Sequence, residues 1–258
     1  MKVLSIDCGI KTLSFCFINI FNYVKEQKEI GNKILKLNFS EEEKKILIDK
    51  LYEKHYKIIL WEKINLCSLS EKMLNLKCFK CNKSAKYHKS NKGFCKKHLI
   101  LPAKEIKEKK AKSMTISDLN KGIISSLDIF PEILGADYIL IENQPSKNPR
   151  MNIVQNILYT YFIMKGAKKI INVSPKYKLR GTNYTEITKI NDLFKSCTKK
   201  NKYNQRKQVS IDYTRYLLKK SNNVYLDYFE KNKKKQDDLA DCFLQAINYS
   251  YKLNNINK

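Results

Sequence analysis

The chain has 258 residues, of which 43% are hydrophobic, and a formal net charge of +26 at pH 7. Such a chain can bury a real core in one large domain or two small ones, which excludes a disordered tail, and it has no run of about 18 apolar residues that could span a membrane. The positive charge favours a polyanionic partner, above all nucleic acid.

The N-terminal residues lack the basic stretch and apolar run of a signal peptide, so we expect an intracellular, non-secreted protein. Its eight cysteines should then be reduced, and close pairs among them suggest a metal site before a disulfide. Cys16 and Cys242 show no ligand spacing and are expected to be buried.

The first part of the chain predicts three strands. Residues 3–7 and 13–20 are apolar runs on either side of a Gly-containing turn, as in a β-hairpin. A helix is expected over 41–55, after Ser40 as its N-cap. Residues 56–64 predict the third strand.

Residues 74–112 interrupt this pattern with a Cys/His cluster and a charged segment. Apolar residues at helical spacing then predict an amphipathic helix over 113–130. Residues 136–142 form a compact apolar strand that ends on a carboxylate. A helix is expected over 150–166, ended by Gly166.

The last part of the chain predicts one more strand and two helices. Pro175 stops an apolar strand at 168–175, and the polar residues 176–205 are expected to be irregular. Helices are predicted over 206–220 and 236–251. Strands that alternate with helices indicate an α/β fold, with a mixed sheet covered by helices.

Carboxylates stand at structurally related points of this predicted fold. Asp7 and Glu142 each end an apolar strand, where sites gather in open α/β sheets. Asp238 and Asp241 share one helix face at i,i+3, and Asp237 reaches the same face at i,i+4. Such a cluster suits two Mg²⁺ or Mn²⁺ ions about 3.5–4 Å apart, as in phosphoryl transfer.

Each acid also has a simpler explanation. Asp237 and Asp238 would favour a helix N-terminus through the helix dipole. Asp7 could close a turn, and Glu142 could cap the helix that follows it. The combination of a strand Asp, a strand Glu and a helical Asp-x-x-Asp is more specific than any of its members.

Four segments carry a family resemblance: SIDCGIKTLSFCF (5–17), IENQPSKNPRMNIVQNILYTYF (141–162), YNQRKQVS (203–210) and KKKQDDLADCFLQA (233–246). Together they resemble the poxvirus Holliday junction resolvases. More distantly they are similar to mitochondrial resolvases and bacterial RuvC. The resemblance implies an RNase H-like fold over residues 1–258.

The resemblance also implies an activity. The expected protein is a homodimeric endonuclease of DNA recombination and repair that resolves four-way junctions by paired symmetric nicks, with two Mg²⁺ (or Mn²⁺) ions in each active site. Its metal-binding acids correspond to Asp7, Glu142, Asp238 and Asp241. Lys207 matches a basic residue near the scissile phosphate. The poxvirus-like motifs, with an AT-rich composition, suggest a viral protein that acts in the infected host cell.

Several other residues are candidate DNA contacts: Lys11, Gln144, Asn148, Arg150 and Arg206. Three of them begin the helix after Glu142 and could contact the phosphodiester backbone. Helix capping by Asn148 and a surface role for Arg150 explain the same residues equally well.

A second metal site is indicated by Cys78-x2-Cys81 and Cys95-x2-His98. Two close pairs joined by a short loop fit tetrahedral Zn²⁺, and four protein ligands make the site structural. His88 is an alternative ligand. We expect a zinc insertion over 74–103 that the family core does not require. It would extend either the junction-binding surface or a dimer contact.

Two other functions compete with junction resolution. One is an RNase H-like nuclease acting on flaps, RNA–DNA hybrids or transposon ends. The other is a non-catalytic, zinc-containing DNA-binding protein that keeps the acids as remnants. A binder would tolerate Asp7→Asn, whereas a nuclease would not.

Overall fold

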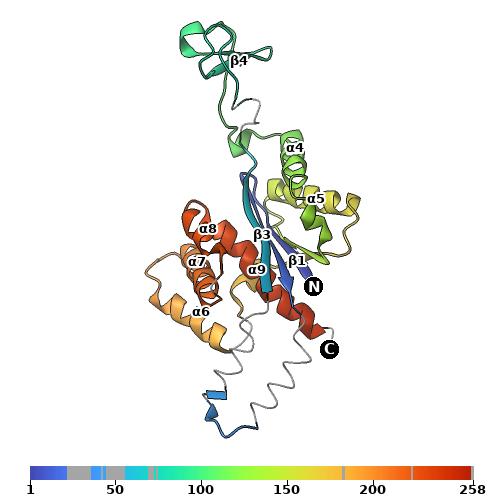
Figure 1. Cartoon of the computed structure of the whole chain (residues 1–258), viewed down its shortest axis with the longest axis vertical. Coiled ribbons are helices and arrows are strands. Elements are labelled where there is room, and N and C mark those ends of the chain that lie inside the picture. The colour runs from blue at the N-terminus through green and yellow to red at the C-terminus, as the bar shows by residue number, and fades with distance from the viewer. Residues whose placement is uncertain are drawn as a thin grey trace.

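The structure is a computed structural model that describes residues 1–21, 36–41, 43–44, 56–68, 73, 75–181, 184–221 and 223–256. Its centre is a five-stranded sheet (Figure 1). The strands are β1 (Lys2–Asp7), β2 (Thr12–Ile20), β3 (Tyr56–Asn65), β7 (Tyr138–Glu142) and β8 (Ile170–Val173).

The strand order is β3-β2-β1-β7-β8. The first three strands pair antiparallel, whereas β7 runs parallel to both β1 and β8. This order and this mixture of directions are those of an RNase H-like sheet, so the expected fold class is confirmed. Because β1 and β7 are parallel neighbours, their carboxyl ends lie at the same edge of the sheet.

Helices cover both faces of the sheet (Figure 1). On one face, α4 (Ile116–Leu127) and α5 (Pro149–Met164) close a core around Phe15, Phe17 and Phe162. The other face carries α6 (Tyr184–Ser196), α7 (Lys202–Lys220), α8 (Tyr225–Lys231) and α9 (Gln236–Ile256). The four central residues of strand β1 are buried because the strand is covered on both sides.

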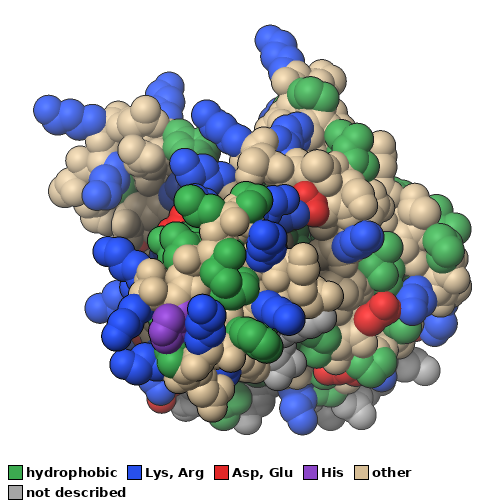
Figure 2. Space-filling model, turned by 90° about the horizontal axis from the view of Figure 1, so that it is seen from above, with side chains coloured by type: hydrophobic (Ala, Val, Ile, Leu, Met, Phe, Trp, Pro, Cys, Tyr) green, Lys and Arg blue, Asp and Glu red, His purple; other side chains and the backbone are tan. Residues whose placement is uncertain are grey.

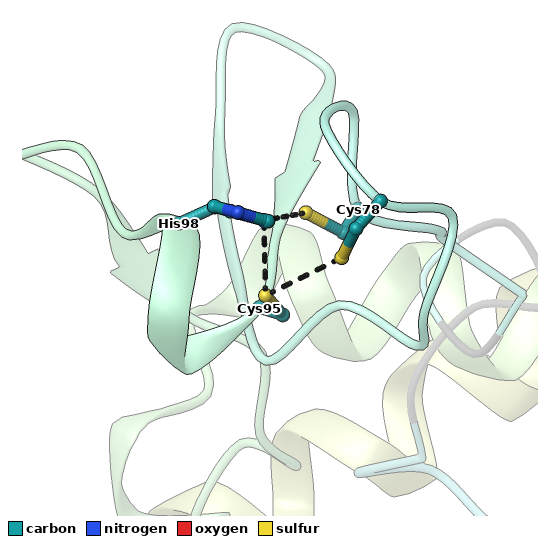
Figure 3. Close-up of side chains that lie close together, drawn as sticks. Cys78, Cys95 and His98 are labelled. Carbon is teal, nitrogen blue, oxygen red and sulfur yellow. Dashed lines mark hydrogen bonds between the residues drawn. The ribbon is translucent and has the colours of Figure 1, made fainter.

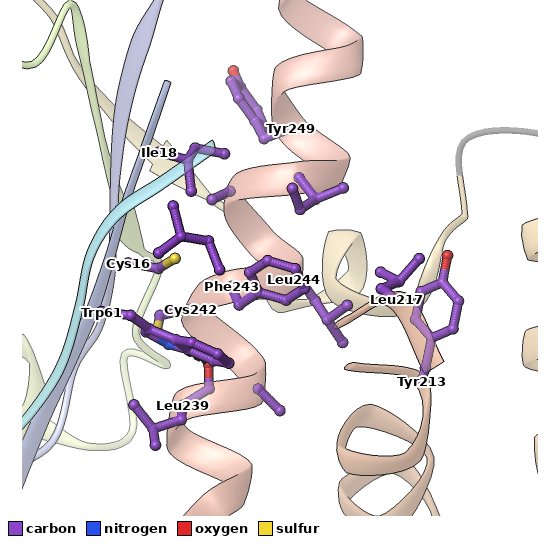
Figure 4. Packing of buried hydrophobic residues seen from close by; sticks show 14 of the residues in the cluster. Cys16, Ile18, Trp61, Tyr213, Leu217, Leu239, Cys242, Phe243, Leu244 and Tyr249 are labelled. Atoms are coloured by element: carbon purple, nitrogen blue, oxygen red, sulfur yellow. Dashed lines mark hydrogen bonds between the residues drawn. The ribbon is translucent and has the colours of Figure 1, made fainter. Parts of the chain in front are cut away.

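Helix α9 lies between the sheet and α7 (Figure 4). Phe243 is fully buried, and its ring centroid lies 5.2 Å from that of Trp61. The Trp61 indole N–H donates to the Leu239 carbonyl over 3.1 Å. These contacts hold the first turns of α9 against β3, which fixes the acidic residues of the helix relative to the sheet.

A second, three-stranded sheet lies apart from this body (Figure 1). Its strands are β4 (Tyr87–Lys89), β5 (Lys92–Phe94) and β6 (Lys104–Glu105), in the order β5-β4-β6. Ser90 and Asn91 both have positive φ angles, 45° and 64°, as in a tight two-residue hairpin turn. Strands β4 and β5 fall inside the predicted insertion (74–103), whereas β6 lies just beyond its end.

All five strands of the central sheet, and the helices around residues 113–130, 150–166, 206–220 and 236–251, were predicted. The prediction for 176–205 was wrong, because this stretch contains a 3₁₀ turn (Pro175–Leu179) and α6. Helix α8 was not predicted either. Most of the helix expected over 41–55 lies outside the described residues. None of the helices in the described ranges is long and apolar enough to cross a membrane.

Candidate active site and zinc site

Two carboxylates meet at one edge of the central sheet. Asp7 is the last residue of β1 and Glu142 is the last residue of β7. Both side chains are only 13% exposed. The parallel pairing of these strands therefore brings together two acids that are far apart in the sequence, as expected.

A third carboxylate comes from α9. Asp241 lies one turn after Asp238, and its neighbours Ala240 and Cys242 are fully buried. The Asp238 side chain is 14% exposed, and its Oδ1 lies 3.5 Å from the Lys235 ammonium. Packing of α9 on the sheet thus directs its acidic face toward Asp7.

A buried lysine lies at the point where these acids converge. The Lys178 Nζ lies 3.2 Å from Asp7 Oδ1, 3.0 Å from Glu142 Oε1 and 2.8 Å from Asp241 Oδ2. The residue is 7% exposed and sits in the 3₁₀ turn after β8. One ammonium group therefore contacts acids from three separate elements.

Lys178 was not predicted from the sequence. It falls in the stretch 176–205, which was expected to be irregular, and lysine is abundant along the whole chain. The turn is fixed by Asn248, whose side-chain amide donates to the Lys178 carbonyl over 3.0 Å. Only the three-dimensional arrangement distinguishes this lysine from the exposed ones.

The burial of these groups shifts their protonation. Burial raises the pKa of Asp7 well above its usual range; Lys178 opposes this shift and Glu142 adds to it. Burial also raises the pKa of Asp241, against the effect of Lys178. Burial alone would lower the pKa of Lys178, but Asp7, Asp241 and Glu142 outweigh it and raise that pKa.

The pKa of Asp238 is raised to about 6, first by burial and then by the charge of Asp7. Three carboxyl groups share one ammonium, and Asp238 lies nearby, so the acids outnumber this cation. Hard carboxylate oxygens gathered around one cation position are the ligands that Mg²⁺ and Mn²⁺ prefer. The residues present therefore fit a divalent metal.

Lys207 and Asp237 form an ion pair beside this cluster. Burial alone would lower the pKa of Lys207, but its bond to Asp237 raises it, so the lysine stays charged. The pair lines a hollow of about 270 Å³ together with Lys199, Asn204, Gln208 and Ile211. A fixed positive charge therefore stands next to the carboxylates.

The predicted DNA contacts differ in their surroundings. Lys11 and Arg206 are exposed. The Gln144 side-chain amide donates to the Glu142 carbonyl over 3.2 Å. Asn148 is the N-cap of α5, and Arg150 donates to the carbonyls of residues 111, 112 and 114. Asn148 thus has the capping role that the sequence left open, whereas the Arg150 guanidinium is held by backbone carbonyls and is only partly exposed.

The predicted zinc ligands come together in the small second sheet. One ligand atom from each of Cys78, Cys81, Cys95 and His98 lies within 4.8 Å of the others. Figure 3 shows Cys78, Cys95 and His98 pointing toward one another. His88, the alternative ligand, lies on β4 and outside this group.

The spacing of these atoms fits a tetrahedral ion. The Cys81 and Cys95 sulfurs are 3.7 Å apart, and His98 Nδ1 lies 3.6 Å from the Cys78 sulfur and 3.5 Å from that of Cys95. Zinc–ligand bonds of about 2.3 Å to sulfur and 2.1 Å to nitrogen imply tetrahedral edges of about 3.8 and 3.6 Å. Hydrogen bonds from the backbone and His98 outweigh burial and lower the pKa of Cys78 to about 5, which favours a thiolate.

No family model matches the chain. It is 32% identical over 199 residues to the uncharacterized protein L451 of Acanthamoeba polyphaga mimivirus. The match includes 66% of this chain but only 46% of that protein, so the chain spans less than half the length of this relative.

The chain is also similar to three solved structures. The fowlpox virus resolvase, solved with Holliday junction DNA, gives a TM-score of 0.48 at 14% identity, over 98% of this chain and 99% of that one. The yeast mitochondrial Holliday junction resolvase Ydc2 gives a TM-score of 0.49 at 16% identity, over 96% of this chain and 78% of that one. RuvC of Thermus thermophilus, also solved with a Holliday junction substrate, gives a TM-score of 0.42 at 9% identity, over 98% of this chain and 96% of that one.

Proposed function

We propose that the chain is a metal-dependent endonuclease that resolves four-way DNA junctions. One observation carries the proposal: carboxylates from β1, β7 and α9 converge on one cation position, where each lies within 3.2 Å of the Lys178 ammonium. A purely structural cluster would have no reason to gather more buried acids than the one ammonium that they share can pair, because unpaired buried charge is strongly destabilising. The net charge of +26 favours a DNA substrate.

The chain's own residues would divide the work as follows. Asp7, Glu142, Asp238 and Asp241 hold two Mg²⁺ or Mn²⁺ ions. When bound, these ions activate the attacking water and stabilise the leaving oxygen of the phosphodiester. Lys207, oriented by Asp237, stabilises the negative charge that develops on the scissile phosphate.

Lys178 balances the carboxylates when no metal is present. Its Nζ contacts three of the four proposed ligands, so the lysine keeps the acids apart from water and close to one another. A site arranged in advance loses little conformational freedom when its ligand arrives.

A junction needs two cuts, so two active sites are required. We propose a homodimer in which each protomer nicks one of two symmetry-related strands.

The Cys/His cluster is proposed to bind one structural Zn²⁺, because its four protein ligands leave no open position for catalysis.

The test is cleavage of a labelled four-way junction beside a linear duplex of the same sequence. The wild-type protein should make paired nicks in the junction with Mg²⁺ or Mn²⁺ and none in EDTA. Asp7→Asn and Asp241→Asn should each lower the rate at least 100-fold while junction binding persists. Asp227→Asn, which changes an exposed acid of α8, is the matched control and should cut normally.

Other results would select the competing functions. Tight binding without cutting in either metal would overturn the catalytic proposal and favour a DNA-binding module. Equal cutting of flaps or RNA–DNA hybrids would keep the metal site and remove the junction preference.

A further inference from the structure

The small sheet and its zinc cluster form a separate projection, which we call the lysine lobe (residues 75–106). In Figure 1 it extends from the end of the body that lies beyond α4. Its strands are short, and its buried apolar side chains are few, with Cys78 at 3% exposure and Phe94 at 4%. Such a segment cannot be held by a hydrophobic core alone, so the metal cluster must supply much of its stability.

The lobe carries nine lysines and a single acid, Glu105, so its positive charge is almost uncompensated. Residues 75–104 contain no Asp and no Glu. The lysines of this stretch are all exposed: Lys77, Lys80, Lys83, Lys86, Lys89, Lys92, Lys96, Lys97 and Lys104. Figure 2 looks onto this end of the molecule and shows Lys and Arg side chains spread over the face, with few acidic ones.

These charges are attached to a rigid framework. The Cys78 N–H donates to the Lys83 carbonyl over 2.7 Å, and the Lys86 N–H to the Phe94 carbonyl over 2.9 Å. A Cβ at Gly93 would lie only 2.4 Å from the Lys77 carbonyl oxygen, so the two chain segments pack backbone to backbone. Lysines held in this way lose less freedom on binding a partner than those of a flexible tail.

We propose that the lysine lobe binds the phosphate backbone of a duplex DNA arm outside the cleavage site. The inference rests on the proposed function, which supplies the duplex arms. A fixed array of like charges is repulsive on its own and is relieved by a partner with regularly repeated negative charge, which duplex DNA carries. The lobe therefore extends the DNA-binding surface beyond the active site.

The lobe has lysine but no arginine, and this determines the mode of binding. Arginine has the rigid fork that suits bidentate contacts, whereas lysine acts as a point charge. Contacts to phosphate set position and affinity without reading the bases. The lobe should therefore bind arms of any sequence, with a strong dependence on salt.

The test compares two triple variants of the full chain. The first replaces Lys83, Lys86 and Lys89 by alanine, and the control replaces the exposed lysines Lys57, Lys121 and Lys195, which lie outside the lobe. Affinity is measured on four-way junctions with long and short arms between 50 and about 200 mM salt. Zinc content, measured on each preparation, shows that the lobe is folded.

The lobe variant should bind the long-armed junction about 10- to 100-fold more weakly, and the slope of log affinity against log salt should fall by about 0.9 for each phosphate that the lobe no longer neutralises. Its affinity for short arms, and its cutting rate at saturation, should equal those of the wild type. The control variant should keep the wild-type slope. If the slopes of the lobe variant and the wild type agree on long arms, the proposal is wrong.

The two proposals fail in different ways. If the wild type cuts no DNA, the nuclease proposal fails, but the affinity comparison still tests the lobe. If cutting is normal and the lobe variant instead loses binding only to vesicles with anionic lipids, the lobe proposal is overturned and the nuclease proposal stands. A single substitution, Lys86→Glu, keeps the test valid if the triple variant loses its zinc.

Discussion

At the scale of single residues, the main feature is an ammonium group that three acids share. Lys178 Nζ contacts Asp7, Glu142 and Asp241 at 2.8–3.2 Å in a largely dry setting. Removing one member of a buried set of paired charges lowers stability more than removing all of them, since the remaining charges are left without a partner. The lysine therefore stabilises the metal-free site.

Lys178→Met should lower the free energy of unfolding by about 3–5 kcal/mol in EDTA, because the carboxylates keep their burial and lose their cation. Urea denaturation measures this loss. Adding Mg²⁺ should restore more stability to the variant than to the wild type. Lys176→Met changes an exposed lysine of the same turn and should have little effect. Equal losses in the two variants would contradict the role of Lys178.

The pKa of Asp238 predicts a pH dependence of stability. A carboxyl whose pKa is about 6 in the folded chain, above its unfolded value near 3.8, adds stability below about pH 4. That contribution is lost as the pH rises through 6 in the metal-free protein. The Asn side chain of the Asp238→Asn variant stays neutral at every pH. The free energy of unfolding of this variant, relative to that of the wild type, should therefore rise by about 1–3 kcal/mol between pH 4 and 7.

Thermal or urea unfolding of the metal-free Asp238→Asn protein over this pH range checks the prediction. The difference in unfolding free energy between Asp227→Asn and the wild type should not change with pH, since that side chain is exposed. If the difference for Asp238→Asn also did not change with pH, the prediction of a raised pKa for Asp238 would be contradicted.

Only some residues of the candidate site could be predicted from the sequence. Asp7, Glu142 and Asp241 were identified because strand ends and helix periodicity constrain where such residues lie. Lys178 was missed because nothing in a polar, lysine-containing stretch marks one lysine as buried. Its position depends on the 3₁₀ turn after β8 and on Asn248, which is 70 residues away in sequence.

At the scale of elements, α9 links the core to the site. Its apolar side packs on Trp61 and α7, and its acidic side faces Asp7. Helices α6 and α8 were harder to foresee. The apolar residues of α6 are separated by many polar ones, and α8 is only seven residues long. Such short or polar helices form because tertiary packing, and not propensity, holds them.

Phe243→Ala should lower the free energy of unfolding by about 3–5 kcal/mol, because it removes a fully buried ring between α9 and the sheet. Urea denaturation measures the effect. Ile163→Ala, on α5, removes a side chain from a residue that is 64% exposed and should change stability by at most about 0.5 kcal/mol. A small loss at Phe243 would contradict the packing described for α9.

The lysine lobe should bind one Zn²⁺ per chain. Cys95→Ser and His98→Asn should each lower the bound zinc severalfold in metal analysis, because a thiolate or imidazole ligand is lost. Cys197→Ser changes a cysteine outside the cluster and should leave the zinc content unchanged. Full zinc binding by the two ligand variants would exclude this site.

At the scale of the whole molecule, the proposed pair of symmetric nicks would require two copies of the site. The protein should therefore elute with twice the mass of one chain in light scattering. A mixed dimer of wild-type and Asp7→Asn protomers should nick only one of the two strands of a junction. If purified heterodimers of this kind nicked both strands, the proposal that each active site cuts one strand would be contradicted.

The order of the carboxylates along the chain has a consequence for synthesis. Asp7 emerges early from the ribosome, Glu142 near the middle, and Asp241 only with the last described helix. A nascent chain that ends before α9 would lack Asp238 and Asp241, which are two of the four proposed metal ligands, and the packing that closes the second core. Under the proposed function, the catalytic site would therefore become complete only once α9 has been made and has packed on the sheet.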